Sequence, residues 1–328
     1  IMGSTQINIS NSIIKENNAV SFGGGISVPW ESSLIMNNVE IANNSTTEGG
    51  GGIFVGQGTS LNISNTIISN NEVTNNGAGG GILCKTEGEG GINLILDYIT
   101  FSGNSANANG SSGGAISSND RDIGMVLSNS TIVNNSAYYG GAMYLRDLNG
   151  NPDFINEINN SIIYYNETLA SLNGDWSDNY TEAEAIVIVK YSNIEGGEES
   201  FGNIAAEDCV GECDITYESS NIDATPLFCD ADNGDFTVRS DSPVLGAGQD
   251  GADMGAYGVG CELIIGCTDN YALNYSSEVD ISDNSTCEYP DNGDYSLSFD
   301  GVDDYVQIEQ SEQFAIGNSS HTLMTWVY

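Results

Sequence analysis

Two short segments, SSNDRD and YLRDLNG, carry acidic and basic side chains at a spacing that suits cooperative chemistry. Their central carboxylates, Asp120 and Asp147, are 27 residues apart, and Arg121 and Arg146 lie beside them. If 27 residues make one repeat of the fold, the two carboxylates stack on neighbouring turns. Such a pair could form a catalytic dyad that shares a proton, a calcium site, or surface turn residues that the arginines neutralise. We favour the turn interpretation, because Asp is common in β-turns.

The 27-residue spacing belongs to a repeat in the first half of the chain. An apolar residue stands three places before an asparagine six times, and Gly-Gly-Gly-Ile or a variant of it recurs between these copies. The asparagines are 27, 27, 33, 31 and 31 residues apart, at Asn17, Asn44, Asn71, Asn104, Asn135 and Asn166. A period of this length indicates one structural unit per repeat.

Within each repeat the apolar residues stand two places apart, as in Ile26/Val28 and Ile53/Val55. This alternation predicts strands, and three short strands per repeat predict an all-β solenoid whose turns stack about 4.8 Å apart. Equivalent side chains then form ladders, with apolar columns inside and asparagines that hydrogen-bond the turns or one another. Cys84 occupies an apolar column, so we expect a buried and unreactive thiol.

The segments FSGN and GGAI, between residues 101 and 116, also carry a resemblance. Together they resemble the paired motifs of the polymorphic outer-membrane protein family, whose passenger domains are right-handed parallel β-helices used in surface adhesion. Other copies have Ile in place of Phe and Gly in place of Ala, which widens the resemblance to right-handed β-helix surface proteins in general. The resemblance implies a pectin lyase-like, right-handed parallel β-helix over residues 1–259, at the extracellular or outer-membrane surface of a bacterium.

We therefore expect a non-catalytic secreted or surface scaffold, an adhesin that binds a glycan or a cell-surface protein as a monomer. The alternative is an enzyme, because right-handed β-helices also include polysaccharide lyases, which use calcium and a Lys or Arg base. They include glycoside hydrolases as well, which use several Asp on adjacent turns. In an enzyme, the candidate catalytic residues are Asp120, Asp147, Arg121 and Arg146.

The charge of the chain narrows the choice of partners. Its 46 acidic and 6 basic residues give a formal net charge of -40. This charge excludes nucleic acid as a partner, opposes polyanionic glycans and anionic membranes, and favours divalent cations. No apolar run approaches the roughly 20 residues that span a bilayer, so we expect no membrane insertion. Residue 1 falls inside a strand-like pattern, and we expect a piece of a longer protein that lacks its signal peptide.

The second half of the chain is expected to close the solenoid. Residues 220–258 resemble the last coils of bacterial right-handed β-helix proteins, and we interpret them as an end cap for the open parallel edge. Within them, Asn233-Gly234 predicts a hairpin turn in preference to a calcium loop. The irregular acidic stretch 196–219 is expected to be a side loop.

Six further cysteines follow residue 200, at Cys209, Cys213, Cys229, Cys261, Cys267 and Cys287. In a chain of this type we expect disulfides that form in an oxidising compartment, with their pairing left open. Zinc is the less favoured alternative, because no histidine accompanies them and His321 is the only one in the chain.

Residues 260–290 resemble a short Cys-bounded acidic module that recurs in large secreted proteins of marine bacteria. The resemblance makes Cys267 and Cys287 disulfide partners. Four carboxylates of the module could supply oxygen ligands to calcium: Asp269, Asp280, Asp283 and Glu288. A disulfide-linked connector with a solvated acidic face is the favoured interpretation.

The remaining residues, 291–328, resemble the first strands of a laminin G-like or concanavalin-type jelly roll, a fold that often binds glycans or proteins. The segment LSFDGVDDYV carries this resemblance. A sandwich of this type needs far more chain to close, so we expect a truncated jelly-roll segment here.

Overall fold

The structure is a computed structural model that describes residues 5–86, 88, 90–147, 151–169, 179–183, 186–201 and 214–289. The chain forms two compact units, Ile1–Leu263 and Ile264–Tyr328. The segment that resembles a jelly roll, 291–328, lies outside the described residues, as do Cys209 and Cys213.

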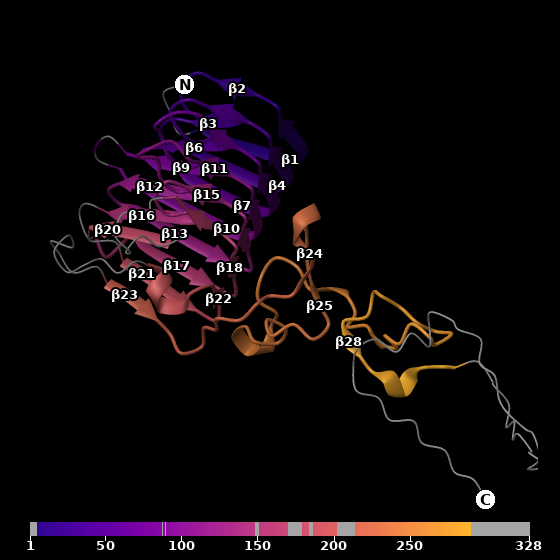
Figure 1. Cartoon of the computed structure of the whole chain (residues 1–328). Coiled ribbons are helices and arrows are strands. Elements are labelled where there is room, and N and C mark those ends of the chain that lie inside the picture. The colour runs from indigo at the N-terminus through magenta and orange to yellow at the C-terminus, as the bar shows by residue number, and fades with distance from the viewer. Residues whose placement is uncertain are drawn as a thin grey trace, which may run out of the picture. The chain divides into compact units, whose positions relative to one another are not determined.

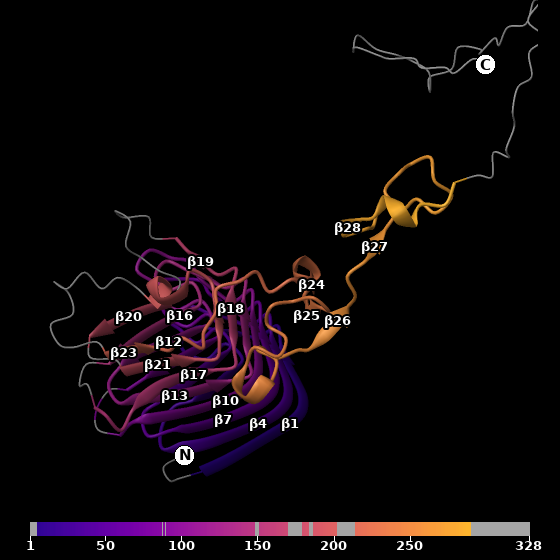
Figure 2. The same cartoon turned by 90° about the horizontal axis from the view of Figure 1, so that it is seen from below.

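The first unit is a parallel β-solenoid, shown in Figure 1 and from below in Figure 2. Its largest sheet runs in the order β1 (Thr5–Lys15), β4 (Ser32–Ala42), β7 (Ser60–Ser69), β10 (Ile92–Ser102), β13 (Ile123–Ser128), β17 (Ile155–Asn159), β21 (Ile186–Lys190) and β23 (Asp214–Tyr217). In the later turns this long strand is divided in two at a corner of the solenoid. The parts that follow the corner are the separate strands β14 (Thr131–Val133), β18 (Ile162–Tyr164) and β22 (Asn193–Ile194).

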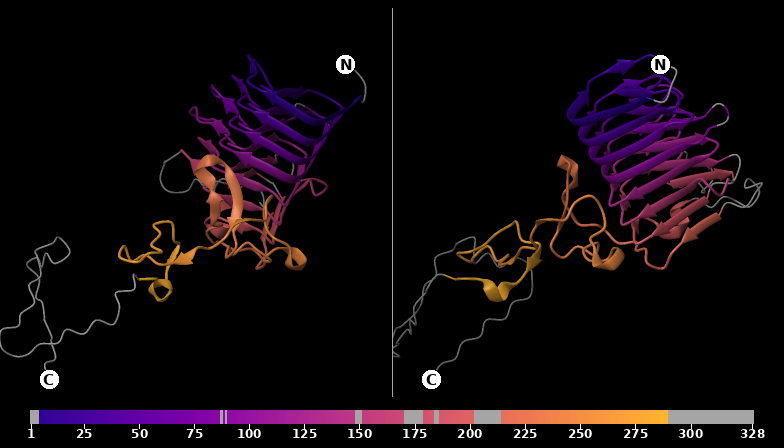
Figure 3. Two further views of the ribbon diagram at one scale, coloured as in Figure 1. Left: turned by 90° about the vertical axis from the view of Figure 1, so that its right-hand side faces the viewer. Right: turned by 180° about the vertical axis from the view of Figure 1, so that it is seen from behind.

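Two further sheets of six strands each form the other walls, and Figure 3 shows the turns stacked on one another. The second sheet contains β2 (Asn18–Ala19), β5 (Ser45–Thr46), β8 (Glu72–Val73), β11 (Ser105–Ala106), β15 (Ser136–Ala137) and β19 (Glu167–Thr168). The third contains β3 (Ile26–Val28), β6 (Ile53–Gly56), β9 (Ile82–Lys85), β12 (Ile116–Asp120), β16 (Met143–Asp147) and β20 (Asn179–Ala183). The prediction of an all-β parallel solenoid is confirmed.

Stacked apolar columns fill the interior of the solenoid. One column runs from Met36 through Ile63 and Leu96 to Leu127, which are in-register partners on four strands and are at most 1% exposed. Full burial of such a side chain contributes about 1.5–3 kcal/mol. Cys84 lies in a neighbouring column as a free, fully buried cysteine, and burial raises the pKa of its thiol. The expected core role of this cysteine is confirmed.

A residue with left-handed backbone conformation turns the chain at the same corner of each turn. Its φ lies between 48° and 56°, and the column reads Asn11, Asn38, Asn65, Tyr98, Asn129, Asn160 and Tyr191. Asparagine tolerates this conformation better than other residues with a side chain, because its short amide hydrogen-bonds locally. Tyr98 and Tyr191 lack such an amide and are therefore exceptions in this column.

The repeated glycines allow backbone to pack directly on backbone at another corner. A Cβ at Gly51 would overlap the carbonyl oxygen of Gly80 in the next turn, and Gly114 meets the same obstacle from Gly141. Any side chain here would push neighbouring turns apart, which explains why Gly-Gly recurs in every repeat.

Residues 226–263, here called the side segment, pack beside the solenoid and not over its end. Met254 is fully buried in a cluster with Ile162 of β18. The backbone N–H of Ala256 donates to Oγ1 of Thr131 on β14 at 3.0 Å. The prediction that residues 220–258 cap the solenoid is therefore wrong for residues 226–258, whereas Ile222 does pair in parallel with Asn193 at the edge of the last turn. The physical reason is that β18 presents an apolar side chain outward, and the chain returns to bury it.

Three short strands and a disulfide hold the side segment together. They are β24 (Phe228–Asp230), β25 (Asp235–Arg239) and β26 (Val259–Cys261). The chain turns from β24 to the antiparallel β25 through η2 (Ala231–Asn233) and Gly234, whose φ is 82°, so the predicted hairpin is confirmed. A disulfide joins Cys229 of β24 to Cys261 of β26.

The stretch 196–219 is not the predicted side loop where the structure describes it. The short 3-10 helix η1 (Gly197–Phe201) places the Phe201 ring in the core, 1% exposed, 6.3 Å from the Tyr217 ring. β23 pairs in parallel with β21 and so extends the largest sheet. The prediction failed because it weighed the acidic residues of this stretch above the few apolar ones that enter the core.

The described part of the second unit is small and contains a disulfide. Its described residues contain the parallel pair β27 (Ile265–Gly266) and β28 (Ile281–Ser282) and the 3-10 helix η4 (Asn284–Thr286). A disulfide links Cys267 to Cys287, which confirms the pairing that the resemblance implied. Among residues 264–289, which the structure describes, most of the large apolar side chains are exposed, Leu273 by 71%, so this part of the unit has no large core.

Candidate binding groove

The backbone makes Asp120 and Asp147 in-register partners at the ends of β12 and β16. Their side chains lie outside the described part of the structure. Next to Asp120, Oγ1 of Thr86 lies 3.4 Å from the backbone nitrogen and 3.3 Å from the backbone oxygen of Arg121. The side chain of Arg146 is half-buried. These contacts tie adjacent turns together, and catalysis by the pair stays the less favoured alternative.

The repeat asparagines form a continuous hydrogen-bonded ladder. Oδ1 of Asn104 accepts the backbone N–H and the Nδ2 of Asn71, at 3.1 and 2.9 Å. Nδ2 of Asn104 donates to Oδ1 of Asn135 at 2.9 Å and to the backbone oxygen of Ile68 at 2.8 Å. The ladder runs through Asn17, Asn44, Asn71, Asn104, Asn135 and Asn166. Because the buried amides use their hydrogen bonds within the fold, the ladder is structural.

Asp269, Asp280 and Asp283, three of the four carboxylates predicted to bind calcium, accept local hydrogen bonds. Asp269 accepts the backbone N–H of Tyr271 at 2.9 Å and the hydroxyl of Tyr289 at 2.8 Å, and these bonds lower the pKa of its carboxyl. Asp283 accepts the backbone N–H of Ser285 at 2.9 Å. In the described part of the chain no group of three or more Asp, Glu, His or Cys side chains could hold a metal ion. The structure does not gather Asp269, Asp280, Asp283 and Glu288 into such a group.

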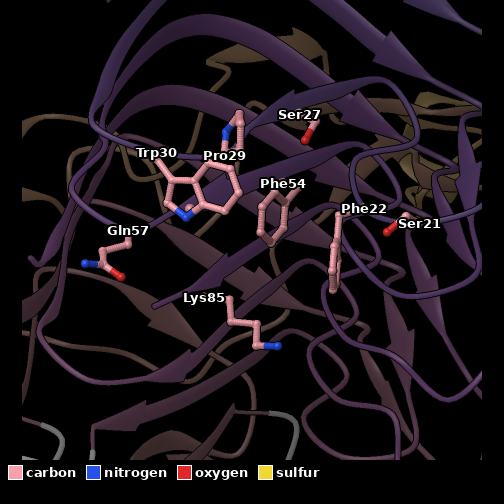
Figure 4. Close-up of a pocket in the computed structure, with 9 residues that line it drawn as sticks. Ser21, Phe22, Ser27, Pro29, Trp30, Phe54, Gln57 and Lys85 are labelled. Carbon is pink, nitrogen blue, oxygen red and sulfur yellow. The ribbon is translucent and has the colours of Figure 1, made fainter. Parts of the chain in front are cut away.

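A pocket lined by aromatic side chains lies on the outer face of the third sheet (Figure 4). Phe54 points outward from β6 because its neighbours Ile53 and Val55 fill the interior, each with no exposed surface. Its ring stacks on Phe22, with the ring centroids 4.6 Å and the ring planes 26° apart. Phe22 stands directly before Gly23, whose φ of 75° turns the chain towards β3. The two rings therefore meet because of the corner and the strand alternation.

Trp30 and Lys85 complete this aromatic pocket. Trp30 lies in the connection from β3 to β4, and its side chain is 63% exposed. The Nζ of Lys85 lies 5.6 Å from the ring centroid of Phe22, within range of a cation–π interaction. A Cβ at Gly56 would overlap the carbonyl oxygen of Pro29, so this glycine allows the connection to approach β6. The pocket has a volume of about 310 Å³.

A second, more polar pocket of about 320 Å³ adjoins the first, because both are lined by Phe22 and Lys85. Glu48, Asn76 and Ser112 also line it, and Oε2 of Glu48 accepts a hydrogen bond from Oγ of Ser21 at 2.7 Å. We refer to the aromatic pocket and this polar pocket together as the groove. Its lining combines flat apolar rings with amide, hydroxyl, carboxylate and ammonium groups.

Sequence reasoning missed the groove, although one signal was available. The in-register residues that point outward on the third sheet are Ser27, Phe54, Leu83, Ser117 and Tyr144, so three of the five are large and apolar or aromatic. Large apolar residues at outward positions are a departure from a polar outer face. Trp30 and Lys85 had no comparable signal, because Trp30 lies in a connection and Lys85 is the last residue of β9, in register with a glycine, Gly56.

The comparisons with known proteins agree with the fold. Residues 98–119 match the Chlamydia polymorphic membrane protein (Chlamydia_PMP) repeat, over the segment from the second half of β10 to β12. No curated protein and no solved structure matches the chain. The repeat and the parallel β-solenoid fit a surface or outer-membrane β-helix protein of the adhesin type. Among the described residues, no helix is long and apolar enough to cross a bilayer.

Proposed function

We propose that this chain is a non-catalytic, extracellular β-helix scaffold that binds a neutral glycan in the groove as a monomer. The observation that carries the proposal is the exposed Trp30 next to the stacked rings of Phe22 and Phe54. A pyranose ring presents a flat face of C–H groups, which suits the face of an aromatic ring. Ligand pockets of about 300–1,000 Å³ with a few placed polar groups are typical of small-molecule sites.

The charge of the molecule favours a neutral ligand. A net charge of -40 repels polyanions at a distance, and the groove itself offers one ammonium, on Lys85, and one carboxylate, on Glu48. Charged and amide groups of this kind hydrogen-bond sugar hydroxyls well, because charge-assisted hydrogen bonds are the stronger ones. We therefore expect the polar pocket to bind the sugar unit next to the one that stacks on the aromatic rings.

The rigidity of the solenoid supports recognition by a preformed site. Phe54 is only 9% exposed and belongs to a small cluster with Ala78 and Leu83, so its ring is fixed before a ligand arrives. Binding to fixed groups loses less conformational entropy than binding that must order them. A rigid stack of turns also suits a stalk that holds such a site away from a cell surface.

The proposal is tested by binding of the whole chain to a panel of neutral and acidic polysaccharides in calcium-containing buffer. We expect retention on at least one neutral polysaccharide and a loss of at least tenfold in affinity in Trp30→Ala. The matched control is Ile13→Ala, which truncates another apolar side chain of similar exposure, 64%, on β1 of the largest sheet and outside the lining of the groove. Equal binding by Trp30→Ala and the parent chain would overturn the proposal.

The same panel tests the enzyme alternative. Reducing ends indicate a hydrolase, and unsaturated products indicate a lyase. The specific observation behind this alternative is the in-register pairing of Asp120 with Asp147. Product formation that disappears in Asp120→Ala or Asp147→Ala would replace the scaffold proposal with an enzyme.

A further inference from the structure

A crevice separate from the groove lies where the side segment meets the largest sheet. It has a volume of about 200 Å³ and is lined by Asn65, Ile67, Tyr98, Ala256 and Tyr257, together with Thr66 and Thr100. The side segment supplies Ala256 and Tyr257, and β7 and β10 supply the other residues. The crevice therefore forms only because the chain folds back on the solenoid after its last turn.

The walls of the crevice are fixed by hydrogen bonds. Oγ1 of Thr100 donates to the hydroxyl oxygen of Tyr257 at 2.8 Å, and Thr100 is only 2% exposed. The backbone N–H of Gly255 donates to the backbone oxygen of Asn160 at 2.7 Å. Tyr257 is therefore held in place, whereas Tyr98 and Ile67 on the opposite wall remain 47% and 42% exposed.

Tyr98 is the residue of the crevice that the fold itself does not explain. Its φ is 54°, in the corner column that five other turns fill with asparagine. Elsewhere in that column the amides bond along the stack, as from Asn38 to Asn11 at 2.8 Å and from Asn160 to Asn129 at 3.3 Å. A bulky residue with positive φ is strained, and it places little of its ring in the core. Strain held at an exposed aromatic residue points to a use outside the core.

We propose that this crevice is a second binding site, for a single neutral pyranose ring that stacks on Tyr98. The site does not depend on the groove. Its volume is below the range of about 300–1,000 Å³ that holds larger ligands, which limits it to one ring. Tyr98 and Ile67 offer apolar contact, and the amide of Asn65 at the rim and the hydroxyl of Tyr257 offer hydrogen bonds to sugar hydroxyls. The net charge of -40 again favours a neutral ring.

The asparagines at the same position in other turns suggest a variant that removes the Tyr98 ring and suits the backbone conformation. Tyr98→Asn removes the ring and installs the residue that neighbouring turns use at the same φ, so we expect the melting temperature to stay or to rise. Tyr191→Asn is the matched control, because Tyr191 occupies the same column with a φ of 49° and does not line the crevice.

The experiment is a titration with methyl β-glucoside and methyl β-galactoside, in which saturation-transfer difference NMR measures binding. All variants carry Trp30→Ala, so that the groove does not contribute. We expect binding of at least one glycoside by Trp30→Ala and by Trp30→Ala/Tyr191→Asn, with an affinity at least tenfold lower in Trp30→Ala/Tyr98→Asn. Absence of binding by Trp30→Ala, or equal binding by all three variants, would overturn the crevice site. Failure of the groove proposal is a different result, namely unchanged polysaccharide binding when Trp30 alone is replaced.

Discussion

The asparagine ladder predicts a stability cost that depends on where the ladder is broken. Asn104→Ala removes four side-chain hydrogen bonds at a fully buried position, two accepted from Asn71 and two donated by Nδ2. At about 0.5–1.5 kcal/mol of net contribution per bond, the loss is about 2–6 kcal/mol. The middle to upper part of this range is expected, because the buried backbone N–H of Asn71 loses its acceptor, whereas Oδ1 of Asn135 keeps the backbone N–H of residue 104.

Asn17→Ala is the internal control for this prediction. The Asn17 side chain lies at the exposed start of the ladder and donates one hydrogen bond, to Oδ1 of Asn44 at 2.9 Å. Its removal is expected to cost about 1 kcal/mol. The Asn44 carboxamide oxygen also keeps the backbone N–H of residue 17, which the substitution does not touch.

The assay is urea unfolding of the two variants and the parent chain, followed by far-UV circular dichroism. The free energy of unfolding is extrapolated linearly, and the slopes are compared first, because a changed slope would signal loss of cooperative unfolding. Equal costs for Asn104→Ala and Asn17→Ala would refute the reasoning. That result would mean that the buried amides find water or other partners when the ladder is cut.

Three further predictions concern the Cys84 thiol, the Tyr217 hydroxyl and the disulfide of the second unit. Because burial raises the pKa of the Cys84 thiol, the native chain is expected to leave this cysteine unmodified by iodoacetamide at pH 8.5, and modification should follow unfolding by denaturant. Burial, followed by the charges of Asp223 and Glu198, raises the pKa of Tyr217 to about 12. The folded state thus holds this proton more tightly, so its stabilising effect is complete below a pH of about 10 and is lost as the pH rises towards 12. Unfolding measured between pH 9 and 12 should show this loss in the parent chain and less of it in Tyr217→Phe. Finally, Cys287→Ser opens a cross-link that spans 20 residues, which contributes about 3 kcal/mol in a chain-entropy estimate. We expect protease to cleave the second unit and to leave the solenoid intact, and cleavage no faster than in the parent chain would contradict the role given to this disulfide.

The sequence by itself determined the parts of this protein that repeat. Each repeat places the same residue types at the same offset, so the alternation of Ile53 and Val55 and the regular spacing of the asparagines carry the strands, the interior columns and the register. Stacked turns contact mainly their neighbours, and a linear pattern is therefore enough to describe those contacts. The pairing of Cys267 with Cys287 followed from the resemblance of a short local module.

The tertiary structure decided what happens on the outside of the stack. Phe22 and Phe54 meet in the groove, and Tyr98 faces the side segment, although no periodic signal relates these residues. The path of the side segment was predicted wrongly for the same reason. The segment packs over Ile162 because this outward side chain is apolar, and the repeat does not specify which outward side chains are apolar. Periodicity reports which side chains enter the core, since every turn must fill the same interior. An outer surface is under no such common constraint, so its sites arise from single residues that only the folded chain brings together.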